Sequence, residues 1–305
     1  MALLSPSFIF STFFYSILFS SSVFAGNNTQ KGIQEHFSAL LHLKHGFNFS
    51  EKASTNLSSW DLNDTDCCVW GGIGCDGDNS HVISIDLSNR RISGRIDFES
   101  LFRLQSLQSL NLASNYFNPS PFSPGFNQNL SSLRELSLDW INISMQGSEW
   151  VQALFLSVPH LRDLSLRYCG LSGPIHSSLS KLHFLKSKLD LSNNNLSGSL
   201  PSFLVNLSKL EYLDLSFNSF SGPIPSSYGN EFRNKLGGGL DVIHNASSSQ
   251  LEYIYLGNNY LQGMVSFIFK LVKLSSISLP FNNFSGVVEV GSFQTLKSLF
   301  SLSFR

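Results

Sequence analysis

Leucine and other apolar residues return along most of the chain in one fixed pattern. The stretch from Leu210 to Pro225 reads LEYLDLSFNSFSGPIP, with further leucines at Leu213 and Leu215 and an asparagine at Asn218. The alternation Leu-x-Leu predicts a short strand with one buried face. The asparagine side chain carries both donor and acceptor groups, so it can satisfy backbone groups at a stacked turn.

Most neighbouring copies of the pattern are roughly 23 to 28 residues apart, which is within the range of leucine-rich repeats. The second apolar residue of each strand falls at Leu87, Leu112, Leu138, Leu166, Leu191, Leu215, Leu256 and Leu279. One such unit cannot bury its own leucines, whereas stacked units bury them in a continuous core. We therefore predict an α/β solenoid over residues 81–305, a right-handed superhelix with a parallel sheet on its concave side, preceded by a cap over residues 26–80.

The first 25 residues, Met1 to Ala25, are mostly apolar and end in a small residue. We interpret them as a secretory signal peptide, although no Lys or Arg precedes Lys31. The alternative is a signal anchor that stays in the membrane. N-glycosylation sequons, N-x-S/T, agree with secretion. They begin at Asn27, Asn48, Asn56, Asn63, Asn129, Asn142, Asn195, Asn206, Asn245 and Asn283. An Asn- and Ser-rich repeat also generates some sequons by chance.

The predicted cap begins with a polar stretch, residues 26–37, in which we expect no regular structure. Residues 36–47 then carry apolar side chains at helical spacing. His42 and His45 lie three residues apart on that helix, but no third ligand accompanies them, so we interpret them as surface histidines.

Tryptophans and cysteines follow in the cap. Trp60 and Trp70 are expected to close one end of the solenoid by packing. In a secreted chain cysteines form disulfides, and Cys68 with Cys75 would close a short loop. A zinc site would need four well-spaced ligands, which this segment does not supply.

Composition and motifs argue against several functions. The net charge is -1 and 13% of the residues are charged, which does not favour nucleic acid or an acidic membrane surface as partner. The glycine run at 237–239 lacks the Lys-Ser/Thr of a phosphate loop. Asp86, Asp190 and Asp214 share one repeat position, so we interpret them as surface residues of the strands. We expect neither enzyme activity nor a cofactor.

The residues between the strand leucines point away from the core, because strand side chains alternate. Several of them are aromatic or charged, the residue types favoured at binding hot spots. They are Glu135, Asp139 and Trp140 on the third strand, Asp163, Arg167 and Tyr168 on the fourth, and Tyr253, Tyr255 and Phe281 on the last two. Our hypothesis is that these residues contact a ligand, and the alternative is that they shield one another along the sheet.

The motif LSxNxLSGxIP resembles the plant-specific class of leucine-rich repeats. The Trp60…Cys67-Cys68-x-Trp70…Cys75 segment resembles the cap of plant receptor-like kinases and receptor-like proteins. The blocks at residues 133–150, 164–175 and 178–185 resemble receptor-like proteins of the Verticillium wilt resistance type. This resemblance implies an ectodomain on the extracellular face of the plasma membrane. It also implies recognition of a peptide or protein ligand in pathogen perception, and signalling through a membrane receptor kinase as co-receptor.

The chain also departs from that family. Members are much longer, with a transmembrane helix and a short cytoplasmic tail, so we expect a truncated or internally deleted ectodomain. The repeat spacing is irregular around residues 226–250. The family's cysteine near the start of the cap helix is missing, which leaves Cys67 without the partner that the resemblance implies, and Cys169 is also expected to be unpaired. The alternatives are a secreted inhibitor resembling the polygalacturonase inhibitors, or a truncated product without function.

Overall fold

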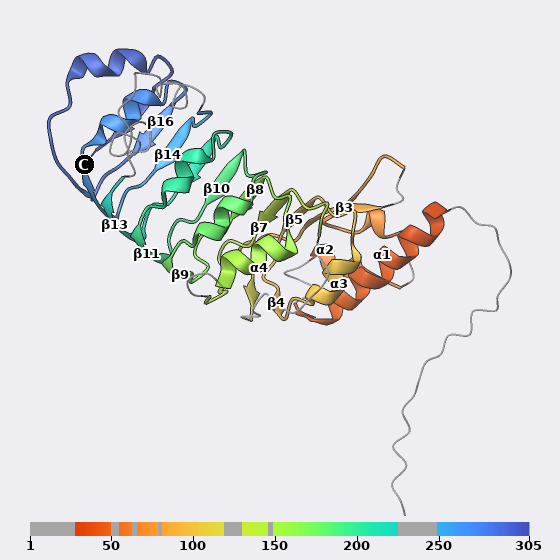
Figure 1. The fold of residues 1–305 in the computed structure, drawn as a ribbon. Helices are drawn as coiled ribbons and strands as arrows, with labels where there is room; N and C mark the ends of the chain where they lie inside the picture. The colour runs from red at the N-terminus through yellow and green to blue at the C-terminus, as the bar shows by residue number, and fades with distance from the viewer. Residues whose placement is uncertain are drawn as a thin grey trace, which may run out of the picture.

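The computed structural model describes residues 28–49, 55–62, 66–78, 81–118, 130–145, 149–224 and 249–304. The predicted signal peptide lies outside these residues, as does almost all of the irregular stretch at 226–250. The described chain forms an elongated stack of coils, with the N-terminal helices at one end and the last strands at the other (Figure 1). This arrangement confirms the predicted solenoid.

The main sheet runs the length of the stack. Its parallel strands are β3 (Val82–Asp86), β5 (Ser109–Asn111), β7 (Glu135–Ser137), β8 (Asp163–Ser165), β10 (Lys188–Asp190), β12 (Tyr212–Asp214), β14 (Tyr253–Tyr255), β16 (Ser276–Ser278) and β18 (Ser301–Ser303). The antiparallel strand β2 (Ile73–Cys75) closes the N-terminal edge. Matching leucines pair across neighbouring coils, so that Leu189 lies opposite both Leu164 and Leu213. The outward side of this sheet is called the main sheet face below.

Shorter strands and helical turns complete each coil. One small sheet joins β1 (Phe47–Asn48), β4 (Ser93–Gly94) and β6 (Tyr116–Phe117), and another joins β9 (Ser172–Pro174), β11 (Asn195–Ser199), β13 (Ser219–Pro223), β15 (Tyr260–Gly263) and β17 (Asn283–Phe284). The helical elements are α1 (Asn28–His45), α2 (Thr55–Ser58), η1 (Cys67–Val69), α3 (Phe98–Arg103), α4 (Glu149–Ser157), η2 (Ser177–Lys181), η3 (Ser202–Asn206), η6 (Val265–Lys270) and η7 (Val290–Thr295).

The repeat asparagines hold adjacent coils together. The Nδ2 group of Asn194 donates to the carbonyls of Leu191 in its own coil (3.0 Å) and Leu166 in the preceding one (2.8 Å). Its Oδ1 accepts from the amides of Cys169 and Leu171, each at 3.0 Å. The same bridging role is taken by Asn115, Asn218, Asn259 and Asn282. Backbone groups that would be costly to bury unpaired are thus satisfied between coils.

The cap closes the N-terminal end of the core. Helix α1 begins at Asn28, so the expectation of no regular structure over residues 26–37 was wrong for its described part. Trp60 and Trp70 are buried and stack with ring centroids 5.6 Å apart. Cys68 and Cys75 form a disulfide.

The two remaining cysteines, Cys67 and Cys169, are buried free thiols. Burial raises the pKa of Cys67 to about 11 and raises that of Cys169 further still. Cys169 occupies the asparagine position of its coil, where its Sγ donates to the Leu138 carbonyl at 3.2 Å. A thiol has only one weak donor, so this coil lacks the double bridge that asparagine makes elsewhere.

The two strands on either side of the long spacing between Leu215 and Leu256 pair with each other. Strand β12 pairs directly with β14, with Tyr212 opposite Tyr253 and Asp214 opposite Tyr255. These strands are immediate neighbours, so no complete coil separates them.

Candidate functional site

The residue before the asparagine position has a left-handed backbone in successive coils. Positive φ is found there at Asn89, Ser114, Trp140, Tyr168, Asn193, Phe217, Asn258 and Phe281. The amide of each of these residues up to Asn258 donates to a carbonyl of the next coil, for example Trp140 to Arg167 at 2.8 Å and Phe217 to Gly257 at 2.9 Å. The solenoid therefore imposes this conformation whatever side chain stands there.

The aromatic and charged residues of the third and fourth strands meet on the main sheet face. The rings of Trp140 and Tyr168 stack with centroids 3.8 Å apart and planes 17° from parallel. The Arg167 guanidinium carbon lies 5.4 Å from the centre of the Tyr168 ring. Trp140 is nevertheless 53% exposed and Tyr168 39% exposed, so their outer surfaces are available to a partner.

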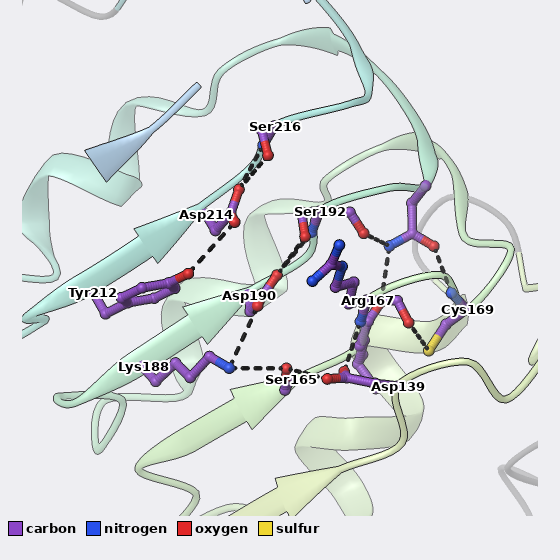
Figure 2. Close-up of polar contacts among 12 residues, drawn as sticks. Asp139, Ser165, Arg167, Cys169, Lys188, Asp190, Ser192, Tyr212, Asp214 and Ser216 are labelled. Atoms are coloured by element: carbon purple, nitrogen blue, oxygen red, sulfur yellow. Dashed lines mark hydrogen bonds and ion pairs between the residues drawn. The ribbon is translucent and has the colours of Figure 1, made fainter. Parts of the chain in front are cut away.

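A chain of polar contacts crosses the next strands (Figure 2). Asp139 accepts from the Arg167 amide at 2.9 Å and from the Ser165 hydroxyl at 3.0 Å. Lys188 donates to the Ser165 hydroxyl at 3.2 Å and lies 3.4 Å from a carboxylate oxygen of Asp190. The contacts fix the orientation of these side chains before any ligand arrives.

The repeated aspartates play a local structural role. Each of Asp86, Asp190 and Asp214 accepts from the backbone amide two residues later, at 2.9 to 3.1 Å. Asp190 is only 4% exposed, so its interpretation as a surface residue was wrong. Ser192 and Lys188 cover its carboxylate.

Three carboxyl groups of the face have raised pKa values. Burial is the main cause for Asp139, Asp163 and Asp214. Negative neighbours add to it, namely Asp190 beside Asp139 and Asp214, and Glu135 beside Asp163. Cations offset part of these pKa shifts, namely Lys188 beside Asp139, Lys186 beside Asp163 and Arg167 beside Asp214.

The predicted site residues form two separate groups. Glu135, Asp139, Trp140, Asp163, Arg167 and Tyr168 belong to the adjacent strands β7 and β8 and the turns after them. Tyr253 and Tyr255 lie on β14, three strands beyond β8, and Phe281 follows β16. Phe281 is 72% exposed and, among the residues that the structure describes, its ring contacts neither group.

Sequence reasoning missed residues that connect these groups. The Tyr212 ring lies 6.1 Å from Tyr253 and 5.6 Å from Tyr255 by centroid, and Lys188 lies 5.4 Å from its centre. Phe217, 53% exposed, occupies the same repeat position as Phe281. A comparison of equivalent repeat positions would have found both Tyr212 and Phe217.

The sequons with described side chains lie away from the main sheet face. Asn48, Asn142, Asn195 and Asn283 are all exposed, and three of them are on strands of the two smaller sheets, β1, β11 and β17. Asn142 follows the left-handed turn of the third coil. The side chains of the other six predicted sequon asparagines lie outside the described part of the chain.

Two further properties concern only the residues that the structure describes. No group of three or more His, Cys, Asp or Glu side chains is arranged to hold a metal ion. None of the described helices combines the length and apolar character needed to cross a bilayer.

Family models match parts of the chain. The leucine-rich-repeat N-terminal domain matches residues 34–76, and the leucine-rich repeat matches residues 160–182, 187–207 and 209–230. The chain is 32% identical over 208 residues to Receptor-like protein 6 of Arabidopsis thaliana, an alignment covering 50% of this chain and 21% of that protein. It is 31% identical over 173 residues to a receptor-like protein Cf-9 homolog of Solanum lycopersicum, covering 49% of this chain and 20% of that protein.

Solved structures show the same architecture. The ectodomain of the Arabidopsis receptor kinase HAESA, in complex with an extended IDA peptide hormone, gives a TM-score of 0.70 at 26% identity and covers 90% of this chain and 41% of that one. A plant ice-binding protein gives a TM-score of 0.50 at 26% identity, covering 88% and 78%. The closer resemblance to the Verticillium wilt resistance type stays a prediction. The chain therefore carries a leucine-rich-repeat N-terminal domain followed by leucine-rich repeats, it spans about a fifth of the length of these two relatives, and both relatives are plant receptor-like proteins.

Proposed function

We propose that this chain recognises an extracellular peptide or protein on its main sheet face, as the ligand-binding part of a plant cell-surface receptor-like protein. The observation that carries the proposal is the exposed Trp140–Tyr168 stack with Arg167 beside it. Tryptophan, tyrosine and arginine are the residue types most enriched at binding hot spots. The polar contacts around Asp139 hold the backbone beneath this stack, so little order has to be gained on binding.

The relatives support this proposal. The two relatives described above are receptor-like proteins, and the HAESA ectodomain, which has the same fold, was solved with a peptide hormone. We place the chain in pathogen perception at the extracellular face of the plasma membrane. It would act there through a partner receptor kinase.

The exposed sequons on the smaller sheets suit this arrangement. Asn195 and Asn283 would carry glycans on β11 and β17, away from the main sheet face. A glycan is bulky and hydrophilic, so it would leave that face as the one open to a protein partner.

The test uses the chain secreted from plant cells and immobilised on a biosensor, with peptide and protein fractions of a Verticillium culture filtrate as probe. The double variant Trp140→Asn/Tyr168→Asn removes both aromatic rings and introduces asparagine, a residue that tolerates the left-handed backbone. Tyr116→Ala is the matched control, because Tyr116 is 69% exposed on β6. We expect the double variant to bind about tenfold more weakly and the control to bind like wild type. Equal binding by all three proteins would overturn the proposal.

A second experiment addresses the partner kinase. A filtrate fraction that binds should increase the recovery of a receptor kinase with the tagged chain from leaf membranes. Wild type should show this increase and the double variant should not. Recovery that does not depend on the fraction would contradict the role of a co-receptor.

A further inference from the structure

The left-handed position carries aromatic side chains in four coils. Trp140, Tyr168, Phe217 and Phe281 form what is called here the aromatic row, with φ values between 54° and 66°. Bulky side chains are genuine outliers in this region of backbone conformation, at a cost of about 1–2 kcal/mol each. In the other coils the position holds serine or asparagine, and asparagine tolerates the conformation well.

Core packing does not account for these aromatic residues. Phe217 is 53% exposed and Phe281 is 72% exposed, so most of each ring lies in solvent. Strained residues persist where function requires them. A large, exposed, apolar side chain repeated at a strained position therefore points to a ligand.

Three members of the row are regularly spaced. Tyr168, Phe217 and Phe281 follow β8, β12 and β16, which are second neighbours in the main sheet. Adjacent strands are about 4.8 Å apart, so these three residues recur about every 10 Å, and Trp140 stacks on Tyr168 at one end. Asn193 and Asn258 stand between them after β10 and β14, and neither side-chain amide has a hydrogen-bond partner in the described part of the chain.

This alternation matches one kind of peptide. A polyproline II helix has three residues per turn and advances about 9 Å per turn, so one of its faces repeats at nearly the spacing of the row. This helix has no internal hydrogen bonds, so its backbone carbonyls are free to accept hydrogen bonds. The side-chain amides of Asn193 and Asn258 could donate to them. Aromatic-lined surfaces bind such helices in other domains.

The charge beside the row indicates which kind of residue the peptide would carry at one end. Glu135 and Asp163 lie on the strands beside the Trp140–Tyr168 end of the row, and they repel each other. Lys186 offsets part of the charge of Asp163, whereas Lys188 pairs with Asp190 and Arg167 lies beside the Tyr168 ring. A basic residue in the ligand would therefore be attracted to this end.

We propose that the aromatic row binds a proline-rich peptide in the polyproline II conformation, with a basic residue directed toward Glu135 and Asp163. The peptide would lie across the ends of the strands, with proline rings against Tyr168, Phe217 and Phe281. This inference names the ligand class for the proposed function and so rests on it.

The test measures binding of a fluorescein-labelled peptide of two lysines followed by twelve prolines to the secreted chain. Phe217→Ser and Phe281→Asn place at each site a residue type that other coils carry there, and neither change creates a sequon. Removal of strain should leave thermal stability equal or higher. Tyr260→Ala, at a residue 65% exposed on β15, is the matched control.

We expect saturable binding by wild type and Tyr260→Ala, with about tenfold weaker binding for each row variant. A peptide of two lysines and twelve alternating glycines and serines should not bind. Failure of the proline peptide to bind, or equal binding by the row variants, would overturn the inference. Binding of a fluorescein-labelled β-1,4-linked gluco-oligosaccharide that weakens in the row variants, with no binding of the proline peptide, would assign the row to a glycan instead and also overturn the inference.

The two proposals can fail separately. If filtrate fractions bind in a way that depends on Trp140 and Tyr168 while the proline peptide does not bind, only the polyproline inference fails. If neither probe shows dependence on the main sheet face, the proposed function fails as well.

Discussion

The Trp140 indole stacks on the Tyr168 ring with centroids 3.8 Å apart, although both residues have left-handed backbone conformations. Such a stack contributes about 0.5–1.5 kcal/mol beyond the burial of area. The strain at the two residues costs about 1–2 kcal/mol each. The stack therefore offsets only part of this strain, which agrees with the binding role proposed for the exposed pair.

Two substitutions at Tyr168 separate the stack from the strain. Tyr168→Asn loses the stack but relieves the backbone, so we expect the free energy of unfolding to change by less than about 1 kcal/mol. Tyr168→Val loses the stack and puts a β-branched residue at positive φ, so we expect a loss of about 2 kcal/mol. Denaturant unfolding of both variants measures the difference. Equal stability of the two would show that the backbone there is not under strain.

The asparagine position offers a second comparison, between Asn194 and Cys169. Asn194→Ala leaves the amides of Cys169 and Leu171 without their side-chain acceptor, so we expect a loss of about 2–4 kcal/mol. Cys169→Ala removes only the weak contacts of one thiol with the carbonyls of Leu138 and Arg167 and should cost about 1 kcal/mol. Thermal unfolding ranks the two variants, and the reverse order would contradict the bridging role given to asparagine.

The cap is expected to lose stability in mild acid through His36. Its Nδ1 accepts from the Val82 amide at 2.9 Å, which requires that nitrogen to be unprotonated. Burial, aided by the nearby His81, lowers the pKa of His36 below its usual 6.5. The unfolded chain therefore takes up a proton first, and the stabilisation, complete above about pH 6.5, is lost as the pH falls through and below that value.

Melting temperatures of wild type and His36→Gln between pH 7.5 and 5 test this expectation. Glutamine can accept the same hydrogen bond without titrating, so the variant should show a weaker decline over this range. The raised pKa values of Asp139, Asp163 and Asp214 act in the opposite direction, because protonation relieves their burial cost as the pH falls. An identical decline in the two proteins would exclude His36 as the cause.

The ion pair on the main sheet face gives a further prediction. Lys188→Met removes the cation 3.4 Å from the buried Asp190 carboxylate and should lower the free energy of unfolding by about 1–3 kcal/mol. Lys186→Met changes an exposed lysine two residues away and should cost less than about 0.5 kcal/mol. Chemical denaturation measures the free energy of unfolding of both variants. An equal loss in the two would mean that Lys188 does not stabilise the buried Asp190 carboxylate.

The solenoid could be predicted from the sequence because one physical requirement repeats in every coil. Each Leu-x-Leu strand must bury its leucines against its neighbours, and each asparagine must satisfy the turn that follows. Leu189 and Asn194 illustrate both rules. The start of α1 could not be placed from polarity alone, since a polar first turn is compatible with either helix or loop.

The candidate site was only partly predictable. Alternation along a strand accounts for an outward side chain at Arg167. It does not account for Trp140 and Tyr168, which have the parity of the buried Leu138 and Leu166 and are exposed because the backbone there is left-handed. The burial of Asp190 depends on Lys188 and Ser192 meeting over it, and that packing is not contained in a repeat pattern. The left-handed backbone at Phe217 and Phe281 likewise emerges only when coils are stacked.

Hydrogen exchange of the secreted chain, alone and saturated with a filtrate fraction that it binds, tests the central claim most directly. If the ligand lies on the main sheet face, amides in residues 135–140, 163–168 and 212–217 should exchange more slowly in the complex. Residues 195–199 and 219–223 of the smaller sheet should be unchanged. Protection confined to the smaller sheet would contradict the account.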